Sequence, residues 1–448
     1  MGSVLAIIIY LLCFLMFFVR RERKLVILMV YAICLISVPI NRATIINPVV
    51  FFLLSEIRYL RQYIQAPRRY NLKLFLGVIL LGCVLLIINS PHLRSVQELL
   101  GFIKTELLYK YLLLFVPLIV MTGKKDMSSI VIPVFLSLLI LTFFGVLNLF
   151  TQHADFVDWS LEGQELNEMT EDAGALYSDR DRFRVQAMHF NPFNYGYICI
   201  ALMLFFYYLK REKSVSRIVF FIAVVCCLFG IVFCGCRTLI VCTALGLFCI
   251  YVMTHSLKKT MWMMALLFIL LYLAYLYVPA INEKMDTMVL SVFDTKMRAD
   301  VSGSSIAMRT YQLMAVLAHI RGNFYLGLGY NFFNIDIGWD EGDVVSVNED
   351  LEGLEGIYLN LLLERGIVGL FIYLFFMFLL MRKFFLYRKS DVNGSTFCLS
   401  LCVVYMAFAI ITGELSAAFI TFLLLGIGMK IHSLKSIEGE KPQVSINE

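Results

Sequence analysis

Arginine residues stand at several places where a polar segment of this sequence meets an apolar block. A guanidinium stays charged, and its planar fork of N–H donors matches the oxygens of phosphate groups. Several such groups at one membrane surface are typical of a diphosphate site. The alternative is pairing with the abundant acids of the loops, above all for the alternating run Asp179–Arg182. Arg237 has no acid near it in sequence. The candidates are Arg180, Arg182, Arg184, Arg237, Arg298 and Arg309.

A carboxylate, Glu355, stands where a long polar segment becomes an apolar block. Partial desolvation at such a boundary would raise its pKa and make it a useful base at neutral pH. The alternative is an interfacial acid that favours the N-terminus of the following helix. His189 and His319 are further candidate bases, although a lone histidine near an apolar helix is more often structural.

The polar segment before Glu355 holds a helical pattern and a glycine-rich turn. Apolar residues recur at steps of three and four through Ser304–Ile320, which predicts a helix carrying Arg309 and Tyr311. The turn that follows has Gly327 and Gly329, which let a backbone bend tightly and approach a ligand, although ordinary turns use the same pair. The acids Asp340–Asp343 could hold a metal, but a solvated acidic loop explains them as well.

These residues must be positioned by membrane helices. The chain is 60% hydrophobic and 16% charged, with a mean hydropathy of +0.82. Its apolar residues come in separate blocks of about the length that a helix needs to cross a bilayer. We therefore predict an all-α polytopic membrane protein. The first block, Val4–Val19, has no basic residue before it and no small-residue cleavage site after it, so we expect a retained span rather than a signal peptide.

Apolar blocks and loop charges together predict 12 or 13 spans. We place them at Val4–Val19, Leu25–Ile40, Thr44–Ile57, Leu72–Asn89, Phe102–Thr122, Met127–Phe150, His189–Leu209, Arg217–Cys234, Arg237–Met253, Met261–Val278, Gly366–Met381, Ser395–Ile411 and Leu415–Lys430. With this count every short basic loop falls on one side, as the bias toward cytoplasmic Lys and Arg requires.

The two long loops fall on the opposite, outer side and hold 21 of the 33 acids. We divide the chain into N-terminal helices 1–150, a first long outer loop 151–188, central helices 189–278, a large outer loop 279–356, C-terminal helices 357–430 and a cytoplasmic tail 431–448. All twelve cysteines lie in apolar blocks, which excludes disulfides in the outer loops.

The order of these parts resembles the bacterial family of O-antigen polymerases and O-antigen ligases. The resemblance rests on Arg184 leading to Phe190–Gly196, on Arg237-Thr238, on Arg309-Thr310-Tyr311 leading to Gly327–Gly329, and on Glu355–Gly369 with Tyr358 in it. Ligases of the family carry a His-Asn pair where this chain has Glu355-Gly356. The resemblance therefore favours the Wzy-type polymerases.

The family resemblance implies a GT-C-like bundle in the cytoplasmic membrane that polymerises glycan repeat units carried on undecaprenyl diphosphate. The acceptor hydroxyl would attack the anomeric carbon as the lipid diphosphate leaves, with no cofactor and no required metal. It implies catalytic roles for Glu355, Arg309 and Arg237. Substrate contacts would come from Arg180, Arg182, Arg184, His189, Tyr311, Gly327, Gly329 and Tyr358. A chain-length regulator is a further expected partner, and nucleic acid is not.

A transporter or flippase for a lipid-linked sugar is the alternative of another class. Transporters place ionisable residues at mid-membrane and show inverted repeats with broken helices. Here Lys104, Glu106 and Lys110 are the main charges within an apolar block, and they lie toward its outer half. We expect Glu364 and Arg365 to form a local structural pair.

Overall fold

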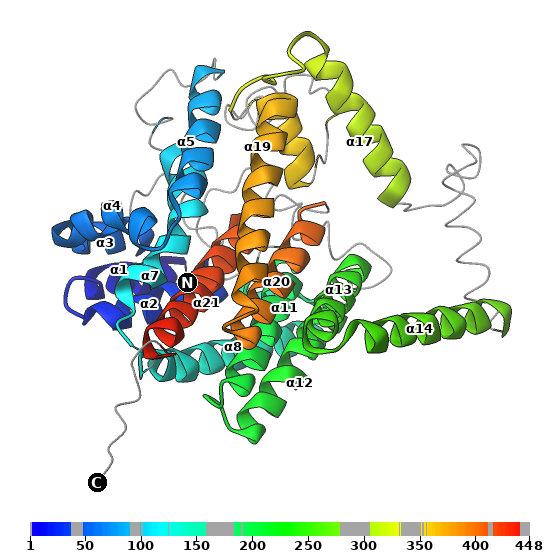
Figure 1. Ribbon diagram of the computed structural model, residues 1–448, viewed down its shortest axis with the longest axis horizontal. Helices are drawn as coiled ribbons and strands as arrows, with labels where there is room; N and C mark the ends of the chain where they lie inside the picture. Colours follow the sequence, from blue (N-terminus) through cyan, green and yellow to red (C-terminus); the bar gives the residue numbers. More distant parts are fainter. Residues whose placement is uncertain are drawn as a thin grey trace.

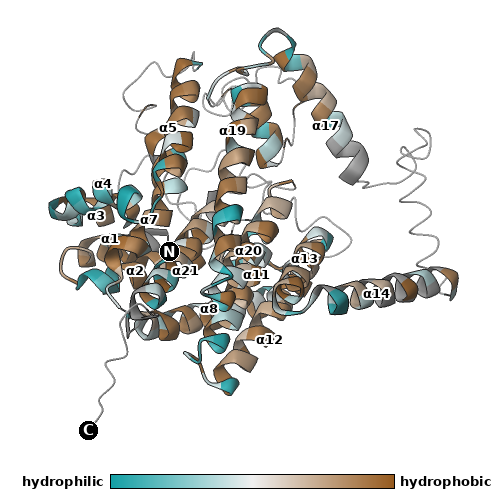
Figure 2. Ribbon diagram, in the orientation of Figure 1, coloured by the Kyte–Doolittle hydropathy of each residue, from teal (hydrophilic) through white to brown (hydrophobic). Residues whose placement is uncertain are grey.

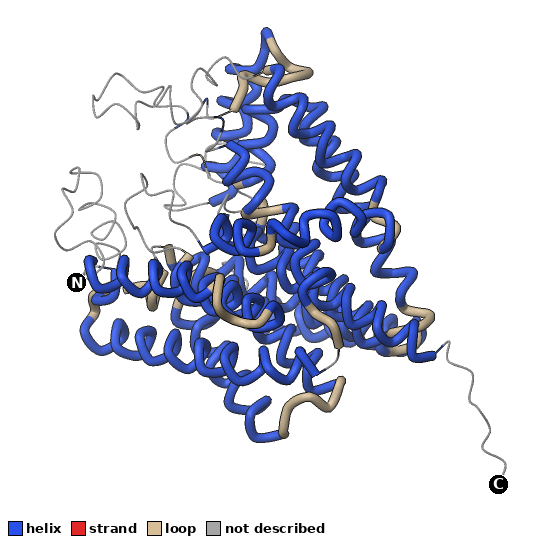
Figure 3. The backbone as a smooth tube through the Cα atoms, turned by 90° about the vertical axis from the view of Figure 1, so that its left-hand side faces the viewer, coloured by secondary structure: helices blue, strands red, loops and turns tan. Residues whose placement is uncertain are grey.

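The computed structural model describes the chain as a bundle of helices joined by short turns. No strand occurs among the residues that it describes, and helices make up most of the tube in Figure 3. The described residues are 2–36, 48–89, 99, 102–123, 125–157, 183–189, 191–277, 305–330, 332, 351, 354, 356–410 and 415–439. An all-α fold is thereby confirmed.

Five described helices are long and apolar enough to cross a membrane. They are α8 (Lys125–Thr151), α11 (Pro192–Arg211), α13 (Arg237–Thr254), α19 (Ile357–Tyr387) and α21 (Leu415–Gly439). A sixth span results if the bent pair ending in α5 (Lys73–Ile88) is counted as one. Two apolar helices are shorter, α12 (Arg217–Phe233) and α20 (Val392–Phe408). The polytopic membrane prediction is confirmed, while the count of 12 or 13 exceeds the five or six that qualify among the described residues.

The other predicted spans correspond to short, bent or interrupted helices. They coincide with α1 (Gly2–Leu15), α2 (Arg21–Val30) and the π-helix η1 (Tyr31–Leu35), and α3 (Pro48–Ser55). The exception is α14 (Leu257–Tyr277), a continuous helix of 21 residues that coincides with the predicted span Met261–Val278. The predicted span Phe102–Thr122 is broken into η3 (Ile103–Leu108), η4 (Tyr111–Leu114) and α7 (Phe115–Val120), with non-helical backbone at Lys110. Hydropathy reports the length of an apolar run and not whether its helix is continuous, which explains the difference in count.

The centre of the bundle is formed by α11 and α21. Within their most apolar stretches 89% of the residues are buried, compared with 33–39% in α8, α13 and α19. Large aromatic side chains such as Tyr195, Tyr197 and Phe419 are completely enclosed there. Helices α8, α13 and α19 therefore present much of their apolar surface to the surroundings, as expected in lipid, and Figure 2 shows hydrophobic residues along their length.

Helix starts are fixed by local chemistry. The side chain of Asn191 accepts a hydrogen bond from the Phe193 amide, 2.8 Å away, and Pro192 occupies the first turn of α11, where a missing donor costs least. Ser216 caps α12 and Asp391 caps α20 in the same way. These caps set where each apolar segment enters the bundle.

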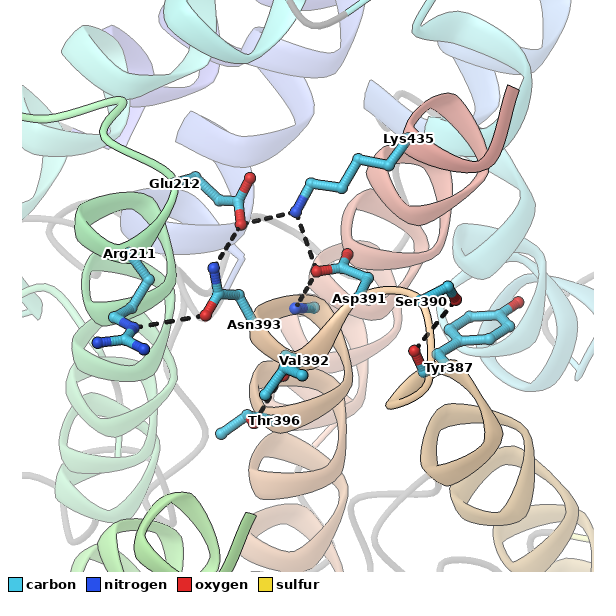
Figure 4. A network of polar contacts seen from close by, with 10 residues as sticks. Arg211, Glu212, Tyr387, Ser390, Asp391, Val392, Asn393, Thr396 and Lys435 are labelled. Atoms are coloured by element: carbon cyan, nitrogen blue, oxygen red, sulfur yellow. Dashed lines mark hydrogen bonds and ion pairs between the residues drawn. The ribbon is translucent and has the colours of Figure 1, made fainter. Parts of the chain in front are cut away.

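One end of the bundle, which we call the basic face, is tied together by charged residues. Lys435 of α21 contacts Glu212, at the end of α11, at 2.7 Å and Asp391, at the start of α20, at 2.9 Å. Asn393 donates to Glu212 and accepts from Arg211, so three helix ends meet in one network (Figure 4). The turns that follow α11 and α19 therefore share one face with the end of α21.

The opposite end, which we call the loop face, carries the turn between α12 and α13, the start of α19, and α17 (Ser305–His319). Figure 1 shows α17 sloping away from the top of α19. The helix predicted at Ser304–Ile320 is thus present. The C-terminal half of α17 packs on α19 through a separate small apolar cluster that includes Val316, Ile320 and Leu363.

Candidate functional site

The long helix α19 is interrupted at Gly366, close to the loop face. Gly366 has φ of 62° and ψ of −167°, so the helix ends and restarts around it. Such a break leaves backbone donors and acceptors without their usual partners, which is costly in an apolar environment. The break therefore requires other groups to pair with it.

The glycine-rich turn after α17 supplies those groups. The amides of Leu328 and Gly329 donate to the carbonyls of Leu363 and Glu364, at 2.8 and 3.0 Å. In the other direction the amides just after the break, at positions 367 and 368, donate to the carbonyls of residues 324 and 325, at 3.0 and 3.2 Å. The turn and the broken helix thus complete each other.

Two glycines make this approach sterically feasible. Gly327 has φ of +79°, and a Cβ on it would lie 2.5 Å from the Gly366 nitrogen. A Cβ on Gly366 would lie 2.4 Å from the carbonyl oxygen of Tyr325. Asn89, at the end of α5, adds hydrogen bonds of 2.7 Å to the carbonyls of Leu326 and Gly327. From the sequence we expected the Gly-Leu-Gly turn to approach a ligand. Its described hydrogen bonds are made with α19 and with Asn89 at the end of α5.

The same break brings a charged residue into the bundle. The buried Arg365 forms an ion pair with the buried Glu106 of η3, and Glu106 also pairs with Lys110 at 2.5 Å. We expected Arg365 to pair locally with Glu364. Its main ionic partner is instead Glu106, which lies 259 residues away in the sequence. A buried acid bound to two cations holds the interrupted segment 102–123 against the interrupted α19.

Arg184 is positioned by the turn between α12 and α13. The Val185 amide donates to the Phe233 carbonyl at 3.0 Å, and the Arg184 guanidinium lies 5.9 Å from the centre of the Phe193 ring. A Cβ on Gly235 would lie 3.0 Å from Cγ of Arg184, so the side chain rests on this turn. Because Arg237 starts α13 two residues later, with an exposed side chain, two of the predicted arginines come from adjoining backbone.

The charge of Arg184 is felt inside this turn. A hydrogen bond with Cys236 lowers the pKa of the Cys234 thiol, burial opposes that shift, and the guanidinium of Arg184 lowers the pKa further. Arg184 and Arg237 place two positive charges at this turn, and such charges attract an anionic group.

His189 has a different environment from the one expected of a base. Its side chain is fully buried, and Nε2 lies 2.9 Å from the carbonyl oxygen of Ile33. Burial lowers its pKa to about 4, although the hydrogen bond to Ile33 opposes this. A neutral imidazole at this position links the loop before α11 to η1.

The remaining predicted residues are distributed as follows. Tyr311 is exposed on α17, and His319 bonds through Nδ1 to the Ala315 carbonyl at 2.9 Å. The Tyr358 hydroxyl donates to the Met406 carbonyl at 2.9 Å, which fixes the start of α19 to α20. Arg309 lies in α17, but its side chain is outside the described residues, as are Arg180, Arg182, Arg298, Glu355 and the acids 340–343. Among described residues no group of three His, Cys, Asp or Glu could hold a metal ion.

Sequence reasoning missed Asn89 and the pairing of Glu106 with Arg365. The signal for the pairing was present, because ionisable residues inside apolar segments usually have a partner or a function. Arg365 directly precedes a glycine within a long apolar segment, and Glu106 stands between two lysines in another. The partner of each could not be identified from one sequence.

Comparison with known families bears on the central part of the chain. Residues 222–374 match the family model described as O-antigen ligase. The match supports the O-antigen ligase and polymerase family. It contains the turn before α13, Arg237, α17, the Gly-Leu-Gly turn and the break in α19, so it covers most of the features described above. A search of curated proteins found no match.

Proposed function

We propose that this protein is a membrane glycosyltransferase of the polymerase type. It joins oligosaccharide repeat units carried on undecaprenyl diphosphate into a surface polysaccharide such as O-antigen. The observation that carries the proposal is the placement of Arg184 on the turn that leads into Arg237, at the edge of the region that matches the family. The matched family includes both polymerases and ligases. The presence of Glu355-Gly356 in place of a His-Asn pair favours the polymerase.

In the proposed reaction the terminal hydroxyl of one lipid-linked unit attacks the anomeric carbon of a second glycan. A new carbon–oxygen bond forms as the bond to the diphosphate breaks, and undecaprenyl diphosphate leaves with the electron pair. A base takes the hydroxyl proton, and Glu355 is our candidate. The diphosphate gains negative charge as it leaves, so fixed guanidinium groups stabilise the transition state more than the ground state.

Arg184, Arg237 and Arg309 are the proposed diphosphate ligands. Arg184 is held against backbone by the contact at Gly235, which preorganises its guanidinium. Arg237 is exposed at the start of α13, where the helix dipole also favours an anion. We place this site at the periplasmic surface of a bacterial cytoplasmic membrane, with the basic face in the cytoplasm and a chain-length regulator as a further partner.

Reconstitution with purified lipid-linked repeat units tests the proposal. We expect a ladder of polymer lengths together with released undecaprenyl diphosphate. Transfer of glycan to an added lipid A core, without a ladder, would assign the protein to the ligases instead. Movement of the lipid-linked unit across the bilayer without formation of a new bond would refute both activities.

A further inference from the structure

A cavity of about 300 Å³ lies at the basic face, between α2, α7, α21 and α4 (Leu60–Arg69). It is at the opposite end of the bundle from Arg184 and the Gly-Leu-Gly turn. Among the described residues that line it, three are cations and none is a carboxylate. The polar ones are Arg21, Gln62, Gln65, Arg69, Tyr70, Thr122 and Lys430.

The guanidinium of Arg21 is held rigidly. Nε donates to Glu56 at 2.7 Å and Nη1 to Gln62 at 2.8 Å, while the group also stacks 4.0 Å from the centre of the Tyr59 ring. Its third nitrogen, Nη2, is enclosed by protein, and Arg21 also interacts with the Tyr63 hydroxyl. Arg21 therefore contributes charge to the cavity wall, because its acidic partner Glu56 is shared with a second cation, Lys24.

Lys430 and Arg69 contribute positive charge to the cavity wall. Lys430 is buried and donates to the Tyr70 hydroxyl and to the Leu118 carbonyl, both at 3.0 Å. Neither acceptor is an acid. Arg69 is exposed and lies 5.8 Å from the centre of the Tyr70 ring. No ion pair is formed by Lys430 or Arg69 with any described residue.

Two nearby acids, Glu56 and Asp126, already have partners. Glu56 is shared between Arg21 and the buried Lys24, whose Nζ lies 2.8 Å from the second carboxylate oxygen. Asp126 accepts from the amides of Thr122 and Gly123, at 2.7 and 3.0 Å. The cavity therefore keeps a positive lining that can attract an anion.

The depth of the cavity in the membrane follows from α4. The segment 57–69 is bent by 110° from α5, so it lies along the membrane surface if α5 crosses it. Figure 1 shows α4 running sideways from the lower end of α5, and Figure 2 shows its hydrophilic residues. Exposed Ile57, Leu60 and Ile64 recur at steps of three and four and form an apolar face for lipid. This geometry places the cavity at the level of lipid headgroups.

We propose that this cavity binds the phosphate of an anionic membrane lipid. The phosphate accepts from Arg69, and the charges of Arg21 and Lys430 attract it. Basic pockets between helices at a membrane surface suit such headgroups. The lipid would join α4 to α7 and α21 without any part in the chemistry proposed at the loop face.

The test compares binding of phosphatidylglycerol by purified full-length protein and by Arg69→Gln, with native mass spectrometry of single lipid adducts. Arg69 is exposed and makes no ion pair, so this variant should fold. Arg68→Gln is the matched control, because Arg68 is the exposed neighbour on the same helix and does not line the cavity. We expect lipid affinity to fall at least fivefold in Arg69→Gln and less than twofold in Arg68→Gln.

Two further arms identify the ligand. Phosphatidylcholine should bind at least tenfold more weakly than phosphatidylglycerol, and inorganic phosphate should raise the thermal midpoint less than the lipid does. Lys430→Gln provides a second variant and should also weaken binding. Equal losses in Arg68→Gln and Arg69→Gln would reduce the interaction to general surface attraction and overturn the site. Equal protection by inorganic phosphate would overturn the assignment to a lipid.

Discussion

A single methyl group at position 327 should separate the Gly-Leu-Gly turn from α19. The backbone of Gly327 has a positive φ, and a Cβ there would meet three backbone atoms of residues 364–366 at 2.5–2.6 Å. These atoms belong to the break in α19 and cannot rotate away as a flexible side chain would. Gly322→Ala is the matched control, because a Cβ on Gly322 meets nothing within 4 Å.

The magnitude follows from two costs. An alanine held at positive φ is strained by about 1–3 kcal/mol. If the turn instead moves away, the four hydrogen bonds that join it to α19 are lost, and each contributes about 1 kcal/mol. Because keeping the positive φ does not remove the clash, the turn should move away at least in part, and we expect Gly327→Ala to destabilise the docked turn by about 2–4 kcal/mol. Gly322→Ala should be neutral or slightly stabilising, within about 1 kcal/mol.

Hydrogen exchange measures this directly. The amides of Leu328 and Gly329 are protected only while the turn is docked, so their exchange should accelerate about 30-fold to 1,000-fold in Gly327→Ala. The thermal midpoint in detergent reports whether the rest of the bundle is intact. If Gly327→Ala exchanges no faster than Gly322→Ala at these amides, the turn is not held by its contact with α19 and our interpretation of the break is wrong.

The remaining predictions concern charges. Glu106→Gln leaves Arg365 buried without its counter-charge and should destabilise the protein by about 3–5 kcal/mol, whereas Glu106→Leu combined with Arg365→Met should cost less; thermal unfolding in detergent distinguishes them. Unfolded histidine binds a proton near pH 6.5 and buried His189 near pH 4, so stability should fall by up to about 3 kcal/mol as the pH drops through that window, and His189→Gln should remove the slope in thermal midpoint. Arg237→Ala and Arg184→Ala should each slow polymer formation about a hundredfold or more in correctly inserted protein, and lysine at either position should not restore it, because a point charge lacks the fork. Unchanged polymer ladders in both alanine variants would refute the diphosphate site.

Much of the membrane architecture could be predicted from apolar blocks and basic turns. Every predicted span coincides with a helix or with a run of short helices among the described residues, and the network at Lys435 shows that basic turns share a face. Hydropathy could not predict that the segment 102–122 is interrupted, because its residues are apolar enough for a continuous helix. Lys110, where the backbone leaves the helical region, was the local sign.

The candidate site was less predictable, since its parts are joined by contacts far apart in sequence. Arg184 and Arg237 were each identified from their surroundings, and the structure explains their approach by the packing of Arg184 on Gly235. The role of Gly366 could not be anticipated, because glycine is common in membrane helices and seldom marks a break. The amide donors and carbonyl acceptors of the 324–329 turn, which pair with the backbone at the break, explain why α19 can be interrupted there.

The break in α19 also links the ionic core to the loop face. Arg365 precedes Gly366, so the change of backbone direction that exposes carbonyls to the Gly-Leu-Gly turn is the same one that aims the guanidinium at Glu106. The Gly-Leu-Gly turn follows α17, the helix that carries Arg309. Both the turn and α17 pack on Leu363. A change at Glu106 should therefore alter the position of α17 as well as the stability of the bundle. The backbone pairing at the break therefore helps to fix where α17, the helix of Arg309, lies.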